Sequence, residues 1–265
     1  MSFSQLIARF GEQHVLSFFL VLARLSPMFV VAPLFSSKMI PARSKSIIAV
    51  GLAIGIAPLA LQGIGHASVP SDPFELLLLI VKEMLVGLAL AYGLAAMFAA
   101  LTTAAAILDM AIGFSFSSLV DPVNGVMGGV INQLYALFGT AIFVAINGDA
   151  WVLKGLARSY DAIPLLDAPK VGTLVEGAQM AFSGILAAAV EVAAPVLLAA
   201  VLCDCAFGLV SRVVPQLNVF GVGFPAKIAV SMLVLAATLP FMAGWMSEHL
   251  DDTVLQALRV LKVAG

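Results

Sequence analysis

Long apolar stretches dominate the chain, and polar residues are confined to short segments between them. Six of these stretches are long enough to cross the core of a bilayer as helices, which takes about 20 residues. They cover residues 15–36, 45–62, 74–112, 130–153, 178–210 and 225–247. The pattern predicts an all-α polytopic membrane protein.

The third stretch, residues 74–112, is longer than a membrane requires. As a helix it would extend about 55 Å, against about 30 Å of hydrocarbon. We therefore expect it to tilt strongly, to break, or to stand partly inside a protein assembly. Small residues recur at helical spacing in the second and third stretches and predict tight helix packing. These helix-packing candidates are Gly51, Gly55, Gly87 and Ala91.

Prolines and polar residues near the ends of the apolar stretches predict further features of the chain. Pro27 and Pro33 indicate that the first stretch is kinked. Residues 154–177 are interpreted as the longest polar insert, and the amphipathic tail from Ser247 as a short helix. The N-terminus lacks a clear cleavage site after its first apolar stretch, so we expect that stretch to be retained.

Composition supports the membrane assignment and excludes other classes. Hydrophobic residues make up 62% of the chain and charged residues 11%, whereas a soluble domain carries about 25% charged residues. A net charge of −2 provides no basic surface for nucleic acid. Lys and Arg divide almost evenly between the two sides of a simple up-and-down topology, so the positive-inside rule assigns no orientation.

Charged residues inside the apolar stretches are costly in lipid and are expected to face protein or water. One interpretation is that they pair with each other or with partner subunits, and the other is that some form the proton relay of a transporter. The residues concerned are Arg24, Lys82, Glu83, Asp109, Glu191 and Asp204.

No motif points to catalysis, a cofactor or a metal. The three histidines are far apart in the sequence, and Cys203 and Cys205 have no second cysteine pair with which to form a metal site. We expect no enzymatic activity and no cofactor.

Residues 113–129 divide the chain, which we interpret as a single domain over residues 1–265, into a front half (1–112) and a back half (130–265). Phe and Ser alternate at its start, and residues that turn or loosen a backbone follow. Bulky apolar side chains on such a backbone can fill an opening and still be moved. We interpret the segment either as a loop that closes a passage between helices, or as a loop whose Phe residues pack into the bundle.

Three blocks of sequence resemble those of a known family. Residues 24–58 contain A-P-x-F, I-P-x-R and a terminal A-P. Residues 113–164 contain G-F-S-F-S-S-L-V-D-P, F-V-A-I-N-G-D-A-W and D-A-I-P. Residues 208–240 contain V-P-Q-L-N-V-F followed by G-F-P. In this order and spacing they are similar to the bacterial flagellar export-gate family FliR, called SctT in virulence type III secretion systems. The pair Asn147-Gly148 with an aromatic three residues later resembles the flagellar branch.

The resemblance implies helices in bent hairpins and a role in conducting proteins. One copy of the chain would assemble with FliP and FliQ, and later FlhB, into a helical gate. The gate would lie in the bacterial inner membrane at the flagellar basal body, and unfolded flagellar subunits would pass through it. The alternative is a secondary transporter or small-solute channel. The sequence lacks the convergent polar residues and the inverted repeat typical of that class.

The resemblance also implies a pore plug over residues 110–127. Its occluding side chains would be Phe114, Phe116, Leu119, Val120 and Met127. Gly113, Ser115 and Ser117 would keep it mobile, and Asp121, Pro122 and Gly125 would shape the loop. Members of the family carry an acidic residue and a Gln just before the plug, where this chain has Ala106 and Ala111. Polar contacts to neighbouring subunits are therefore lost here, or are made by Asp109.

Overall fold

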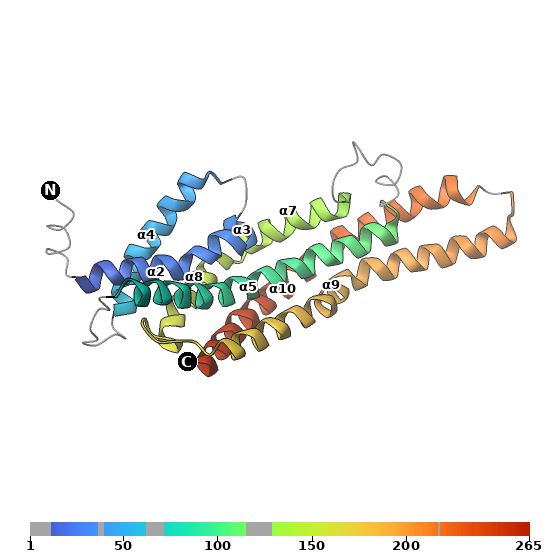
Figure 1. Cartoon of the computed structure of the whole chain (residues 1–265). Helices are drawn as coiled ribbons and strands as arrows, with labels where there is room; N and C mark the ends of the chain where they lie inside the picture. The colour runs from blue at the N-terminus through green and yellow to red at the C-terminus, as the bar shows by residue number, and fades with distance from the viewer. Residues whose placement is uncertain (1–11, 37–39, 62–71, 115–128, 217) are drawn as a thin grey trace. The chain divides into compact units, whose positions relative to one another are not determined.

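The computed structural model describes residues 12–36, 40–61, 72–114, 129–216 and 218–265, and nearly all of them are helical (Figure 1). The helices are α2 (Glu12–Val31), α3 (Pro33–Ser36), α4 (Ala42–Leu61), α5 (Pro73–Ile112), α7 (Val130–Ala145), α8 (Gly148–Ala162), α9 (Val171–Val213) and α10 (Val219–Ala264). Five are long and apolar enough to cross a membrane, or up to six if α7 and α8 together form one span. The prediction of an all-α polytopic membrane protein is confirmed.

Three helices exceed the length that a bilayer requires. α5 has 40 residues, α9 has 43 and α10 has 46, which corresponds to about 60–70 Å of helix. α5 is continuous and does not break. Pro73 stands at its first position, where a missing N–H costs nothing, and no proline follows inside it.

The first apolar stretch breaks at Ala32, directly before Pro33 begins α3, which agrees with the predicted kink, and α2 continues through Pro27. Two other expectations about the ends of the apolar stretches need correction. Residues 154–177 are not simply a polar insert, because α8 extends to Ala162 and buries Leu156. The tail from Ser247 is not a separate helix either: α10 continues without a break to Ala264. No Gly or Pro follows Gly244 before the end of that helix, so nothing in the local sequence stops it.

The described residues pack into two compact units. The first comprises Met1–Ala96, Asn147–Phe182 and Leu250–Gly265. The last turns of α10 are buried in its apolar core, and the Lys170 N–H donates to the Ala264 carbonyl at 2.8 Å. This anchoring explains why the C-terminal part of α10 is amphipathic. The core includes Val86, Ile163, Leu174, Leu261 and Ala264.

The second unit comprises Met97–Ile146 and Ser183–His249. Within it α9 and α10 run antiparallel after a short turn. Lys227 Nζ lies 2.6 Å from an Asp204 carboxylate oxygen, and the Trp245 ring N–H donates to Glu191 at 3.2 Å. Both halves of the sequence contribute to each unit.

Among the described residues, several helices leave most of their apolar surface uncovered. In the apolar segment of α5, 56% of the residues are buried, but in those of α4 and α9 only 28% are buried. Ile47 on α4 is 73% exposed and Leu209 on α9 is 67% exposed. Surfaces of this kind require lipid or other protein chains to cover them.

Candidate functional site

Arg24 forms a fully buried polar cluster inside the first unit. Its Nε lies 2.5 Å from a Glu83 carboxylate oxygen, and the two side chains are 0% and 2% exposed. One terminal nitrogen donates to Ser159 Oγ at 3.1 Å and the other to the Ile163 carbonyl at 3.0 Å. The guanidinium carbon stands 4.0 Å from the centre of the Tyr160 ring. The interpretation that charges in the apolar stretches pair with each other is confirmed for Arg24 and Glu83.

Gly87 lies one turn after Glu83 on α5, against the backbone of α2. A Cβ built at Gly87 would overlap the Arg24 carbonyl. A glycine is therefore required where α5 crosses α2, and the close approach places Glu83 within reach of the guanidinium. Ala91, one turn further along α5, is buried.

Asp109 connects the two helices that flank residues 113–129. It lies near the end of α5 and is 4% exposed. Its two carboxylate oxygens accept hydrogen bonds from the Ile131 and Asn132 backbone N–H groups, at 3.0 and 3.1 Å. These are the second and third residues of α7, whose N–H groups have no acceptor within their own helix. The Asp109 carboxylate thus caps α7, and its charge lies at the positive end of that helix.

The last residues before the predicted plug pack closely as well. Gly113 donates its N–H to the Asp109 carbonyl at 3.1 Å, and it adopts a positive φ of 103°, which favours glycine. A Cβ at Gly113 would lie 2.6 Å from the Phe224 ring of α10. Phe224 belongs to the G-F-P motif, so two of the three sequence blocks meet at this point.

The structure describes part of the predicted site. Gly113 and Phe114 are described, whereas Ser115, Phe116, Ser117, Leu119, Val120, Asp121, Pro122, Gly125 and Met127 lie outside the described residues. Gly51 and Gly55 are exposed on α4, and no atom of the described chain lies within 4 Å of a Cβ built at either. Their role in packing against another chain stays a prediction.

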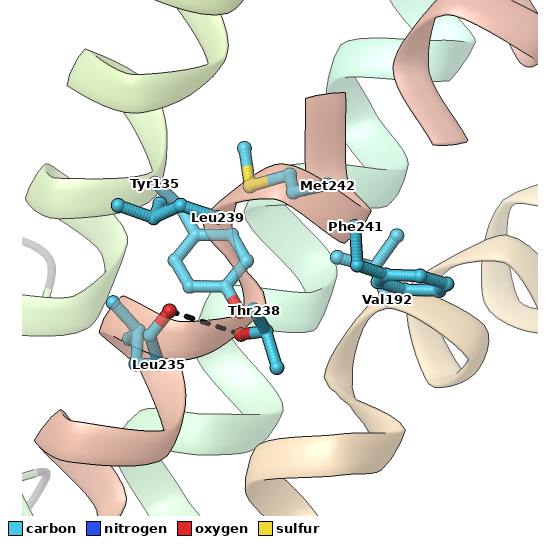
Figure 2. Close-up of a pocket in the computed structure, with 7 residues that line it drawn as sticks. All are labelled: Tyr135, Val192, Leu235, Thr238, Leu239, Phe241 and Met242. Carbon is cyan, nitrogen blue, oxygen red and sulfur yellow. Dashed lines mark hydrogen bonds between the residues drawn. The ribbon is translucent and has the colours of Figure 1, made fainter. Parts of the chain in front are cut away.

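A small crevice in the second unit is lined mainly by apolar side chains (Figure 2). The Thr238 hydroxyl donates its proton to the Leu235 carbonyl at 2.9 Å, so this proton is not free to bind a ligand. None of the lining side chains is charged, which does not favour an ion or metabolite site. The crevice is lined by Tyr135, Val192, Leu235, Thr238, Leu239, Phe241 and Met242.

Comparison with known proteins identifies the family. The model of the family described as "Bacterial export proteins, family 1" matches residues 15–253, which covers most of the first unit, all of the second, and the segment between α5 and α7. The chain belongs to the FliR/SctT family of bacterial export proteins.

Members of the FliR/SctT family align with most of the chain. The flagellar biosynthetic protein FliR of Escherichia coli (strain K12) is 28% identical over 241 residues, covering 91% of this chain and 90% of that protein. FliR of Bacillus subtilis (strain 168) is 33% identical over 222 residues, with 83% and 84% covered. The surface presentation of antigens protein SpaR of Shigella flexneri is 29% identical over 214 residues, with 78% and 81% covered.

Sequence reasoning did not identify the contact between Asp109 and α7. The resemblance to the FliR/SctT family left two possibilities, that polar contacts to neighbouring subunits are lost here or that Asp109 makes them, and the Asp109 carboxylate is bonded within its own chain. One signal was available. α7 begins after Gly128-Gly129, with no Ser, Thr, Asp or Asn at its N-cap to accept these hydrogen bonds.

Proposed function

We propose that the chain is a subunit of a flagellar type III export gate in the bacterial inner membrane. One copy assembles with FliP and FliQ at the flagellar basal body, and FlhB joins later. The observation that carries the proposal is the family match over residues 15–253. Relatives named as flagellar biosynthetic proteins align with most of the chain, which supports the flagellar assignment over the virulence one.

Residues 113–129 close the passage of this gate. Phe114, Phe116, Leu119, Val120 and Met127 form an apolar seal. An ion crossing it would have to leave water for a medium of low polarity, which is strongly unfavourable. An apolar seal contains no strong directed bonds, so an unfolded flagellar subunit can displace it. Gly113, Ser115 and Ser117 keep the backbone adaptable, and Asp121, Pro122 and Gly125 turn it.

The uncovered helix surfaces support an assembly with other chains. α4 and α9 leave apolar residues exposed over most of their length, and α5, α9 and α10 are longer than a bilayer requires. FliP and FliQ would cover much of this surface. Gly51 and Gly55, which meet no atom of the described chain, would let a partner helix approach α4 closely.

The buried charges favour a gate over an ion-coupled transporter. Arg24 and Glu83 hold each other in a fully enclosed cluster, and Asp109 is bonded to the start of α7. The charged groups that could bind and pass on an ion or a proton are therefore already engaged in contacts within the chain. Nothing in the proposal requires catalysis by this chain, and the energy for export comes from other components.

Deleting Gly113–Leu119 tests the seal. The assembled complex should then conduct ions, measured as current across a planar bilayer that contains the purified complex. A milder change, Phe114→Ser with Phe116→Ser, should also leak because it removes apolar bulk. The matched control, Ser115→Ala with Ser117→Ala, keeps the apolar side chains and should show no ion current above that of the wild type. Wild-type conductance in the deletion would contradict the proposed plug.

A further inference from the structure

α7 has no N-terminal cap of its own. The residue at its N-cap position is Gly129, which has no side chain to accept a hydrogen bond. The N–H groups of Ile131 and Asn132 are bonded instead to the Asp109 carboxylate, 22 and 23 residues earlier in the sequence. We call this contact, between the Asp109 carboxylate and these two N–H groups, the Asp109 clasp.

The clasp is buried and its charge is not balanced by a basic side chain. Asp109 is 4% exposed, and among the described residues no Lys, Arg or His forms an ion pair with it. The partial positive charge at the start of α7 and the two N–H groups stabilise the carboxylate instead. The start of α7 therefore stabilises the charge of the Asp109 carboxylate, and the carboxylate in turn supplies hydrogen-bond acceptors to the first turn of α7.

Close packing holds both ends of the segment that the clasp spans. The Asp109 carbonyl accepts the N–H of Gly113, while the carboxylate of the same residue reaches past Gly129 to α7. A Cβ at Gly113 would strike the Phe224 ring, and a Cβ at Gly129 would overlap the Asp109 carboxylate. One residue therefore fixes the end of α5 and the start of α7 with respect to each other.

We propose that Asp109 is the positioning residue of the gate, and that the seal formed by residues 113–129 depends on the Asp109 clasp. This inference rests on the proposed function, because it assigns the clasp a role in holding the plug. The clasp itself belongs to described residues of α5 and α7. Without it, the first turn of α7 loses the acceptors for two N–H groups, and the two ends of the plug segment are no longer held together.

Two chemically different substitutions should open the clasp. Asp109→Ala removes both acceptor oxygens. Gly129→Ala leaves the carboxylate in the chain but places a Cβ where the carboxylate lies. Alanine can adopt the backbone of Gly129, with φ of −63° and ψ of 167°, so the clash is the main effect of that change. Asp109→Asn keeps one acceptor oxygen and should be intermediate.

The matched controls make the same chemical changes elsewhere in the second unit. Asp204→Ala removes a carboxylate whose side chain is 60% exposed. Gly244→Ala adds a Cβ that meets no described atom within 4 Å. Neither control should alter conductance or the exchange of amides at the start of α7.

Hydrogen exchange with residue-level fragmentation reports on the clasp directly. In the purified complex, the Ile131 and Asn132 amides should exchange about tenfold faster in Asp109→Ala and in Gly129→Ala, as expected for a lost helix cap. Conductance, measured on the same preparations, should lie between that of the wild type and that of the Gly113–Leu119 deletion. The intermediate value follows because the apolar side chains remain present but are held less firmly.

The deletion separates failure of the inference from failure of the proposed function. If the deletion leaks and both clasp variants exchange faster and leak, the inference is supported. If the deletion leaks while both variants stay as tight as the wild type, or exchange like it, the inference is overturned. If the deletion does not leak, the plug proposal fails. Faster exchange in both variants would then still support the contact between α5 and α7, and unchanged exchange would overturn it.

Discussion

Removing one member of the Arg24–Glu83 pair should be far more damaging than removing both. Three hydrogen bonds and one aromatic face surround the guanidinium, and neither side chain of the pair is more than 2% exposed. Glu83→Leu leaves the positive charge buried without its counter-ion, and Arg24→Met leaves the carboxylate in the same state. Either change is expected to cost about 3–5 kcal/mol. That loss is a large share of the ~5–15 kcal/mol by which a typical protein is stable.

The double variant Arg24→Met with Glu83→Leu removes both charges and keeps similar volume. Replacing a whole buried ion pair by apolar residues is often neutral or stabilising. Here the Ile163 carbonyl would lose the N–H that it accepts, which costs about 1–3 kcal/mol. We therefore expect the double variant to be about 1–3 kcal/mol less stable than the wild type, and more stable than either single variant.

Unfolding in a mixed-detergent titration, followed for all four proteins in the purified complex, gives the coupling between the two positions. Export, scored as swarming motility, should survive in the double variant, because the pair is structural. The exposed pair of Lys227 and Asp204 is the control, since breaking it should cost less than ~1 kcal/mol. If the losses of the single variants simply add in the double variant, the pairing argument is refuted. A stable double variant that has lost export would instead indicate an ion path.

Four further substitutions test packing, three of them inside the first unit and one, Gly51→Leu, against a partner chain. Tyr160→Phe should leave stability within about 0.5 kcal/mol of the wild type, because it keeps the ring beneath the guanidinium and removes a hydroxyl that has no partner in the described chain; a large loss in thermal stability would contradict this. Gly87→Ala should sharply reduce the folded yield of the chain itself, since its Cβ overlaps backbone, whereas Gly51→Leu should spare the chain and reduce only recovery of the complex. Equal losses of the chain from the membranes of cells that also express FliP and FliQ would be inconsistent with the structure. Gly155→Ala should cost about 1–3 kcal/mol, because a Cβ there lies 2.8 Å from Val254, and Val254→Ala in the same chain should restore part of that loss.

The existence and position of the long apolar helices could be predicted from the sequence, whereas the length of α10, which has 46 residues against a predicted stretch of 225–247, could not. Apolar length decides these elements, and each predicted stretch corresponds to one long helix or to two adjacent ones. The cost of a charge in lipid also predicts that Arg24 faces protein or water, and pairing is one of the two interpretations that this allows. Its partner could not be named, because Glu83 lies 59 residues away and helix patterns do not specify which helices meet.

The remaining features depend on tertiary contacts that no local pattern encodes. α10 continues past Ser247 because its last turns are anchored by Leu261 and Ala264 in the core of the first unit. The amphipathic pattern alone did not show that this tail extends an existing helix. The Asp109 clasp is likewise formed between residues more than 20 positions apart, and local rules place a helix cap next to the helix that it caps.

The native mass of the detergent-purified chain, expressed with FliP and FliQ and then alone, tests the central claim most directly. The export-gate account predicts a large mixed complex that contains FliP and FliQ in unequal copy number and a single copy of this chain. It also predicts that the chain expressed alone yields no stable particle, because too much apolar helix surface stays uncovered. A stable particle of this chain alone, or a symmetric homo-oligomer that transports a small solute, would contradict the account.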